Sequence, residues 1–461
     1  MLGKRELEEI LAIALQGGGD YADIFLEEKI SNLISCEADR IERINSGREA
    51  GAGVRVLAGN STAYAYTNDL SLPALKEAAY VASKAATGQE KGVTNIDLRK
   101  GKPLVDFEII RRPEIVPVEE KVEVVIRGNR AARAVDRRIV QVIVGYSDIR
   151  QRIQLANSKG DLIEDERIRT RFIVHVVAAE GGIIQTGYEA LGGLAGFELV
   201  EGDKPELLAQ RAAKQAVQML TAKPAPSGRM PVVMAAEAGG TMIHEACGHG
   251  LEADLAQKEL SVYTGKLGER VAAEIVTVID DGTIPNKYGS FRFDDEGTPS
   301  QRNILIENGI LRSYMYDRLT AGKDGHHLTG NGRRQSFAHR PIPRMTNTYI
   351  APGQTEPEEI IARVQNGLLV KKMGGGQVNT TTGDFVFDVS EAYLIEKGKI
   401  TVPIRGATLT GNGPEALREI ELVGNDLGFG IGTCGKDGQG VPVSDAQPTI
   451  LIKQLIVGGT G

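Results

Sequence analysis

The chain has 461 residues, more than one ordinary hydrophobic core accommodates, so two or three domains are expected. Its 41% hydrophobic and 25% charged residues are typical of a soluble globular protein. A net charge of -7 without a long basic run argues against nucleic-acid binding, and no apolar run is long enough to cross a bilayer, so we expect no nucleic-acid and no membrane partner. The three cysteines, Cys36, Cys247 and Cys434, do not suggest a disulfide framework, which favours a reducing cytoplasm.

The first part of the chain predicts a helix, then strands, then a second helix. Apolar residues recur at helical spacing over residues 4–15. Residues 22–36 and 51–67 have the composition of strands, and a Gly-Asn turn divides the second of these segments. A helix is expected over residues 71–86, and the polar stretch 87–103 that follows predicts a linker.

The same order of elements recurs after this linker. Helical patterns at 117–135 and 204–220 enclose alternating, strand-like residues at 137–180. The two halves suggest a degenerate duplication, although no residue-level repeat accompanies it. The stretch 221–228, TAKPAPSG, contains two prolines among small residues and marks the clearest boundary in the chain. Most later segments are strand-like and rich in glycine.

These patterns predict an α+β protein. We expect an N-terminal region in which helices flank antiparallel strands, followed by a mainly-β C-terminal domain. The expected limits are an N-terminal α+β subdomain at 1–105, a central α+β subdomain at 106–222 and the C-terminal domain at 229–461.

The stretch HEACGH, residues 244–249, resembles the zinc-binding pattern H-E-x-x-H but has one residue more. Histidines four apart on an α-helix are offset by only ~40°, whereas histidines five apart are offset by ~140° and cannot bind one metal ion. A π-bulge, or a helix end at Gly248, would bring His244 and His249 together. The spacing therefore predicts a metal site on an irregular helix. The alternative is a pair of ordinary, partly buried histidines.

A zinc site needs a third protein ligand, and two cysteines are candidates. Cys247 lies inside the motif, but it is also well explained as a small buried residue. Cys434 lies in the glycine-rich stretch GFGIGTCGKDGQGVPV, where the backbone can approach a site closely. We favour Cys434, bound as a thiolate. Two imidazole nitrogens and one thiolate suit Zn²⁺ well.

Four segments together resemble the TldD family of metallopeptidases, the TldD/PmbA group. They are HEACGHGLEAD, FRFDDEGTPSQRNILIENGIL, RMTNTYIAPG and CGKDGQGVPVSDAQPTILI. The resemblance covers nearly the full length and is densest from Met230 onward. The combination is specific, whereas H-E-x-x-x-H alone would be a weak signal.

The resemblance implies a zinc ion bound by His244, His249 and Cys434, with Glu245 as the catalytic acid/base. It also implies unfolded or short peptides as substrates, cleaved in a cavity between paired subunits. The partner would be a PmbA-like (TldE) chain or a second copy of this one. PmbA subunits lack the metal motif, so this chain resembles the catalytic TldD type.

Two other functions remain open at this stage. A cysteine hydrolase would use Cys434 as the nucleophile and a histidine as the base, and would tolerate chelators. A non-catalytic, PmbA-like chamber subunit would lack the metal motif, which this chain retains.

Several further polar residues are weaker candidates. The acidic turn at 294–297 could line the site or bind a cation, or be an ordinary acidic loop, and we expect it near the cleft. Asp254 or Glu252 could orient a histidine ligand by accepting a hydrogen bond from its other ring nitrogen. Three arginines could pair with a peptide carboxylate, but we expect a surface charge cluster: Arg333, Arg334 and Arg344.

Overall fold

The computed structural model describes residues 1–86 and 96–459, so residues 87–95 of the predicted linker lie outside the described residues. The first half of the chain forms two units with the same order of elements, which is a helix, three antiparallel strands and a second helix. Their strands join into one sheet because β1 of the first unit pairs antiparallel with β5 of the second. The two regions therefore share a sheet, and the expected limits 1–105, 106–222 and 229–461 stay a prediction.

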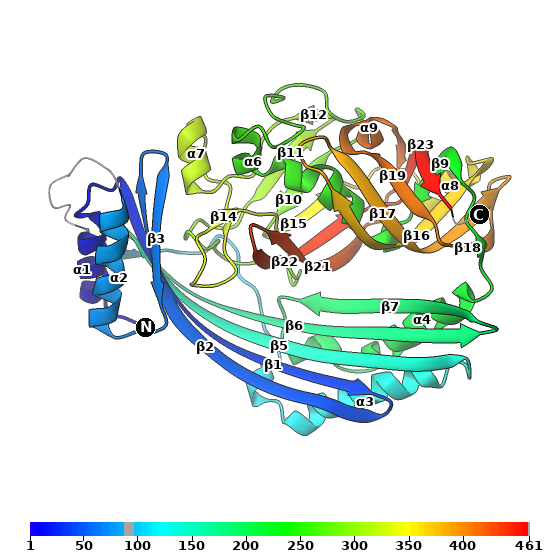
Figure 1. The fold of residues 1–461 in the computed structure, drawn as a ribbon, viewed down its shortest axis with the longest axis horizontal. Coiled ribbons are helices and arrows are strands. Elements are labelled where there is room, and N and C mark those ends of the chain that lie inside the picture. Colours follow the sequence, from blue (N-terminus) through cyan, green and yellow to red (C-terminus); the bar gives the residue numbers. More distant parts are fainter. Residues whose placement is uncertain (87–95, 460–461) are drawn as a thin grey trace.

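The strand order in this sheet is β3-β2-β1-β5-β6-β4, with β7 paired to β6. Figure 1 shows α3 and α4 on one side of the curved sheet, the C-terminal domain on the other, and α1 and α2 at one end. The elements are α1 (Lys4–Leu15), β1 (Tyr21–Glu37), β2 (Arg40–Ala58), β3 (Ser61–Thr67), α2 (Leu72–Ala85), β4 (Arg99–Lys100), α3 (Val118–Arg133), β5 (Ile139–Asn157), β6 (Asp161–Glu180), β7 (Ile183–Gly193) and α4 (Lys204–Met219).

Periodic apolar residues explain why these helices form and which face they bury. In α1, Leu7, Ile10, Leu11 and Ala14 follow the spacing of one helix face, and all four are completely buried against the sheet. The helix α4 has a face rich in alanine, whose small side chains let the strand β7 approach closely. The backbone of Gly187 in β7 lies so near α4 that an added Cβ would overlap a carbonyl oxygen of the helix.

The C-terminal domain contains two larger sheets and a two-stranded ribbon. The six-stranded sheet has the order β12-β11-β10-β15-β22-β21, and the eight-stranded sheet contains β16-β9-β23-β19-β17-β18-β8 with β20 paired to β23. Its strands are β8 (Lys223–Pro224), β9 (Gly228–Met234), β10 (Val278–Asp281), β11 (Arg302–Glu307), β12 (Ile310–Leu311), β13 (Gly332–Arg333), β14 (Ile342–Pro343), β15 (Asn347–Ile350), β16 (Asn366–Val378), β17 (Asp384–Glu396), β18 (Lys399–Arg405), β19 (Thr408–Asn412), β20 (Ile420–Val423), β21 (Gly428–Lys436), β22 (Gln439–Gln447) and β23 (Ile450–Gly458).

Short helices connect these strands and form the motif segment. They are α5 (Thr241–Ile243), a π turn (His244–Gly248), a 3₁₀ turn (His249–Leu251), α6 (Ala253–Gln257), α7 (Arg318–Asp324), α8 (Pro357–Ala362) and α9 (Gly413–Arg418). The predicted α+β class is confirmed, with helices flanking antiparallel strands in the first half and a mainly-β second half. In the described part of the chain, no helix combines the length and apolar character needed to span a membrane.

Candidate metal centre

The motif helix is irregular at the place where the histidine spacing requires it. After α5 the chain makes one π turn, in which the His249 amide donates to the His244 carbonyl five residues earlier. This wider turn brings the two imidazoles onto one side of the helix, with ring centroids 5.0 Å apart. The predicted irregular helix is therefore confirmed. Gly248 fits its position because an added Cβ would overlap the Met345 sulfur.

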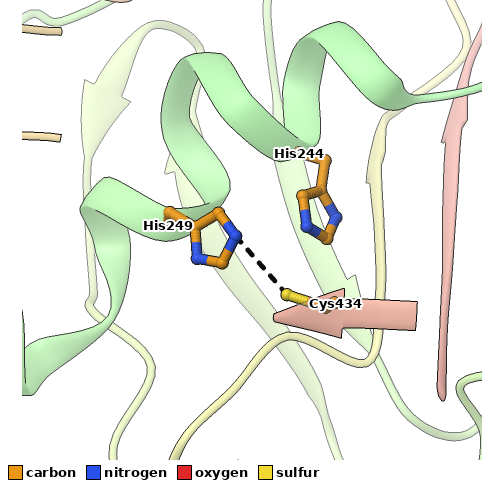
Figure 2. A group of neighbouring side chains, drawn as sticks. All are labelled: His244, His249 and Cys434. Carbon is orange, nitrogen blue, oxygen red and sulfur yellow. Dashed lines mark hydrogen bonds between the residues drawn. The ribbon is translucent and has the colours of Figure 1, made fainter. Parts of the chain in front are cut away.

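Cys434 reaches the two histidines from the other side of the site. It lies on β21, and its Sγ is 3.4 Å from His249 Nε2 (Figure 2). The ligand atoms of His244, His249 and Cys434 all lie within 4.8 Å of one another. A tetrahedral zinc ion with ordinary bond lengths separates such atoms by roughly 3.3–3.6 Å, so this donor set fits one zinc ion after small adjustments.

Cys247 does not join this group. Its thiol donates to the Ile243 carbonyl at 3.4 Å, and its side chain is completely buried in the core of the C-terminal domain. Burial also raises the pKa of this thiol far above its ordinary value. Cys247 therefore behaves as a small core residue, and the structure brings Cys434 to the histidines instead.

The three donor side chains shift one another's protonation. Burial would raise the pKa of Cys434, but hydrogen bonds and positive charge from the two imidazoles lower it to about 5. Burial would lower the pKa of His249, but the carboxylate of Glu252 and the Cys434 thiolate raise it well above its ordinary value. Cys434 is therefore a thiolate at neutral pH, the form in which cysteine binds metal.

Glu245 follows the first histidine directly and is partly buried. Burial raises the pKa of its carboxyl group, although the positive imidazoles of His244 and His249 oppose this. Its carboxylate makes no hydrogen bond or ion pair with any residue that the structure describes. The carboxyl group therefore lies near enough to the three donor side chains for their charges to shift its pKa.

A carboxylate lies near the Nδ1 atom of each histidine. His249 Nδ1 donates to Glu252 Oε2 at 3.1 Å, which directs Nε2 toward Cys434. His244 Nδ1 faces Asp445 Oδ2 of β22 at 3.7 Å, beyond hydrogen-bond distance. Asp254, the other candidate from the sequence, contacts neither histidine and instead accepts a hydrogen bond from Lys436.

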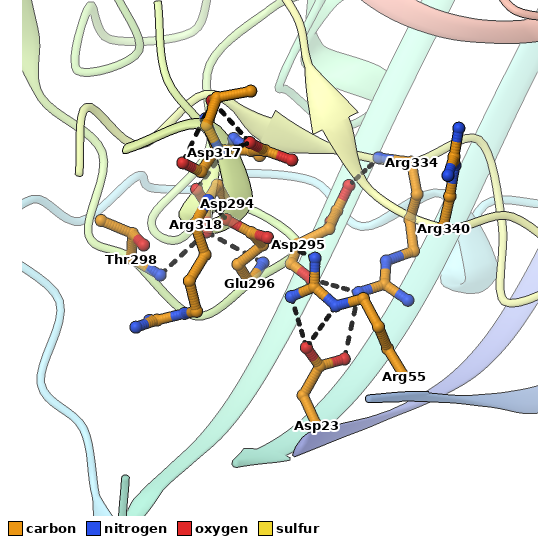
Figure 3. A network of polar contacts seen from close by, with 12 residues as sticks. Asp23, Arg55, Asp294, Asp295, Glu296, Thr298, Asp317, Arg318, Arg334 and Arg340 are labelled. Atoms are coloured by element: carbon orange, nitrogen blue, oxygen red, sulfur yellow. Dashed lines mark hydrogen bonds and ion pairs between the residues drawn. The ribbon is translucent and has the colours of Figure 1, made fainter. Parts of the chain in front are cut away.

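The acidic turn neither lines the metal centre nor lies open to a cation, contrary to two of the possibilities that the sequence left. Its side chains form buried ion pairs that connect the C-terminal domain with the first half of the chain (Figure 3). Arg55 of β2 donates to Glu296 at 2.6 Å, and Arg167 of β6 donates to Asp295 at 2.7 Å. Burial, with the neighbouring charge of Glu296, raises the pKa of Asp294.

The prediction of an arginine surface cluster is wrong. Arg333 and Arg334 are 3% exposed and Arg344 is completely buried. Arg344 donates to the backbone carbonyl of Cys434 at 2.6 Å, while Arg334 pairs with the acidic turn. Sequence reasoning also missed Lys436 and Asp445. The only available signal was the position of Lys436 two residues after Cys434, which places both side chains on one face of a strand.

Three family models match successive parts of the chain. Residues 22–86 match the PmbA/TldA metallopeptidase domain 1, residues 111–220 the central domain, and residues 227–459 the C-terminal domain. Matches over this much of the chain show that it belongs to the PmbA/TldD family of metallopeptidases.

The relatives place the chain within this family. It is 41% identical to the metalloprotease TldD homolog of Haemophilus influenzae, with 100% of this chain and 97% of that protein covered. Two solved structures share the fold. A Thermotoga maritima protein described as a candidate modulator of DNA gyrase is 24% identical with a TM-score of 0.82, covering 99% of this chain and 100% of the other. TldE of Thermococcus kodakarensis is 21% identical with a TM-score of 0.79, covering 98% and 100%.

Proposed function

We propose that this chain is a zinc-dependent peptidase that cleaves unfolded or short peptides by water attack. One observation carries the proposal. Two imidazoles and a thiolate, from segments almost two hundred residues apart, converge within 4.8 Å, and the charges of all three act on the carboxyl group of Glu245. Ordinary buried histidines would need neither the π turn nor a thiol aimed at them.

The residues that would hold the ion are His244, His249 and Cys434. Two neutral nitrogens and one thiolate form a donor set that zinc prefers over magnesium or calcium, which take oxygen ligands. Zinc, when bound in such a site, lowers the pKa of water to about 7 and polarises a carbonyl group.

Glu245 is the proposed catalytic acid/base. Its carboxylate accepts the proton of the attacking water and delivers it to the amine of the departing peptide. The raised pKa brings this group closer to neutral pH than an exposed glutamate, which favours transfer in both directions. No described residue forms a hydrogen bond or ion pair with this carboxylate, so no such contact competes with the proposed proton transfer.

We further propose that the enzyme acts in the cytoplasm as part of a pair of subunits, with a PmbA/TldE-like chain or a second copy as the partner. The fold similarity to a TldE structure supports this, because pairs of subunits are commonly built from copies of one fold. Substrates would be unfolded peptides, since a site between subunits excludes folded proteins.

Metal analysis and chelation separate this proposal from the cysteine hydrolase that the low pKa of Cys434 also allows. We expect one zinc ion per chain, loss of peptide cleavage with a chelator, and recovery on adding zinc. The variant Cys434→Ala should lose zinc, whereas Cys247→Ala should retain it. Cleavage that persists after complete removal of metal would favour Cys434 as a nucleophile and reject the metallopeptidase.

A further inference from the structure

Lys436 occupies an unusual place for a lysine. It follows Cys434 by two residues on β21, and its side chain is only 7% exposed. Its ammonium group donates to Asp254 at 2.6 Å and to the Pro343 carbonyl at 3.0 Å, and lies 3.2 Å from Glu252 Oε2. A buried lysine is costly unless it is fully paired, and here three oxygens surround the charge.

These contacts connect the strand that carries Cys434 to the helix that carries the histidines. The oxygen of Glu252 that lies near Lys436 also accepts the hydrogen bond from His249 Nδ1 at 3.1 Å. His249 in turn directs Nε2 at the Cys434 sulfur. The contacts therefore form a closed series. Lys436 of β21 contacts Glu252, Glu252 accepts a hydrogen bond from His249, and His249 contacts Cys434 of the same strand.

Arg344 completes the charge balance of this buried group. Its Nη2 donates to the Cys434 carbonyl at 2.6 Å, and its Nε lies 3.6 Å from Glu252 Oε1. Two cations thus face two carboxylates, Glu252 and Asp254. All four side chains are largely shielded from solvent: Glu252 and Arg344 are completely buried, Asp254 is 9% exposed, and the side chain of Lys436 is 7% exposed.

We propose that Lys436 is a positioning residue for the metal, acting through Glu252. Lys436 holds the glutamate against His249 Nδ1, which fixes the imidazole with Nε2 toward Cys434, and it ties β21 to the helix so that the thiolate and the imidazole keep their separation. The inference rests on the proposed metal site, but it concerns affinity for zinc and does not require peptidase activity.

The test is the zinc affinity of the full-length chain, measured by competition with a chromophoric chelator. We expect Lys436→Met to weaken zinc binding by roughly 10–100-fold, the range found when a group supporting a ligand is removed. The matched control is Lys121→Met. Lys121 is also 7% exposed and pairs with a buried carboxylate, Asp148, at 2.7 Å, but it lies on α3 in the first half of the chain. The control should bind zinc as tightly as the wild type.

A second set of variants tests whether Lys436 acts through Glu252. Glu252→Gln should weaken zinc binding by itself, and adding Lys436→Met should cost little more. The double variant removes one cation and one carboxylate together, so the buried group stays neutral and the chain should fold even if Lys436→Met alone does not. Wild-type affinity in Lys436→Met, an equal loss in Lys121→Met, or losses that multiply in the double variant would each overturn the proposal. Because zinc is measured without substrate, a failure of the proposed peptidase activity would be seen separately.

Discussion

Replacing Arg55 by methionine should destabilise the protein strongly, because this residue forms a buried ion pair between the first half of the chain and the C-terminal domain. Its side chain is 1% exposed, and its guanidinium pairs with Asp23 of β1 and with Glu296 of the acidic turn, both completely buried. Methionine fills similar space but leaves the buried Glu296 without the cation that it contacts, and leaves Asp23 with Arg334 alone, at 3.6 Å. Breaking a buried ion pair from one side costs about 3–5 kcal/mol.

Thermal unfolding followed by circular dichroism measures this effect. At about 2–4 °C per kcal/mol for a domain of 150–250 residues, the midpoint should fall by roughly 6–20 °C. Arg48→Met is the control on the same strand, since Arg48 forms an exposed pair with Glu28 at 2.8 Å. Such surface pairs contribute at most about 1 kcal/mol. Equal midpoints for the two variants would refute the assignment of the acidic turn as an inter-domain contact.

Two further predictions concern the metal-free site and the helix that shapes it. In metal-free protein, the thiolate absorbance of Cys434 is the part that the variant Cys434→Ala lacks. It should be present above pH about 5 and disappear as the pH falls through that value, because the pKa of Cys434 is lowered to about 5 from an ordinary value of 9.0. A midpoint near pH 9 would contradict the arrangement of the two imidazoles. Gly413→Ala should weaken zinc binding, since an added Cβ would overlap the Ala246 carbonyl in the π turn, whereas Gly435→Ala, where the Cβ meets open space, should bind zinc normally. Unchanged affinity in Gly413→Ala would show that the π turn tolerates displacement.

The sequence was informative wherever a local rule applied. Histidines five apart can share a metal only on a distorted helix, and the chain makes a π turn at His244–Gly248. The glycine-rich surroundings of Cys434 correctly distinguished it from Cys247 as the thiol that lies beside the histidines. That these three residues bind the metal stays a prediction.

Contacts between distant segments could not be predicted. Arg55 and Glu296 are 241 residues apart, and nothing local distinguishes a buried arginine from an exposed one. The same difficulty made the prediction for Arg344 wrong. The first half of β2 escaped notice for the opposite reason, because residues 40–50 are mostly exposed and carry no alternation of apolar and polar side chains.

The central claim is that Glu245 transfers the proton in a zinc peptidase, and one comparison tests it most directly. Wild type and Glu245→Gln, each loaded with zinc and supplied with a PmbA/TldE-like partner subunit, would be incubated with a mixture of unstructured peptides and the products read by mass spectrometry. We expect equal zinc content, cleavage by the wild type, and a loss of nearly all turnover in the variant. Equal cleavage by both proteins would contradict the account.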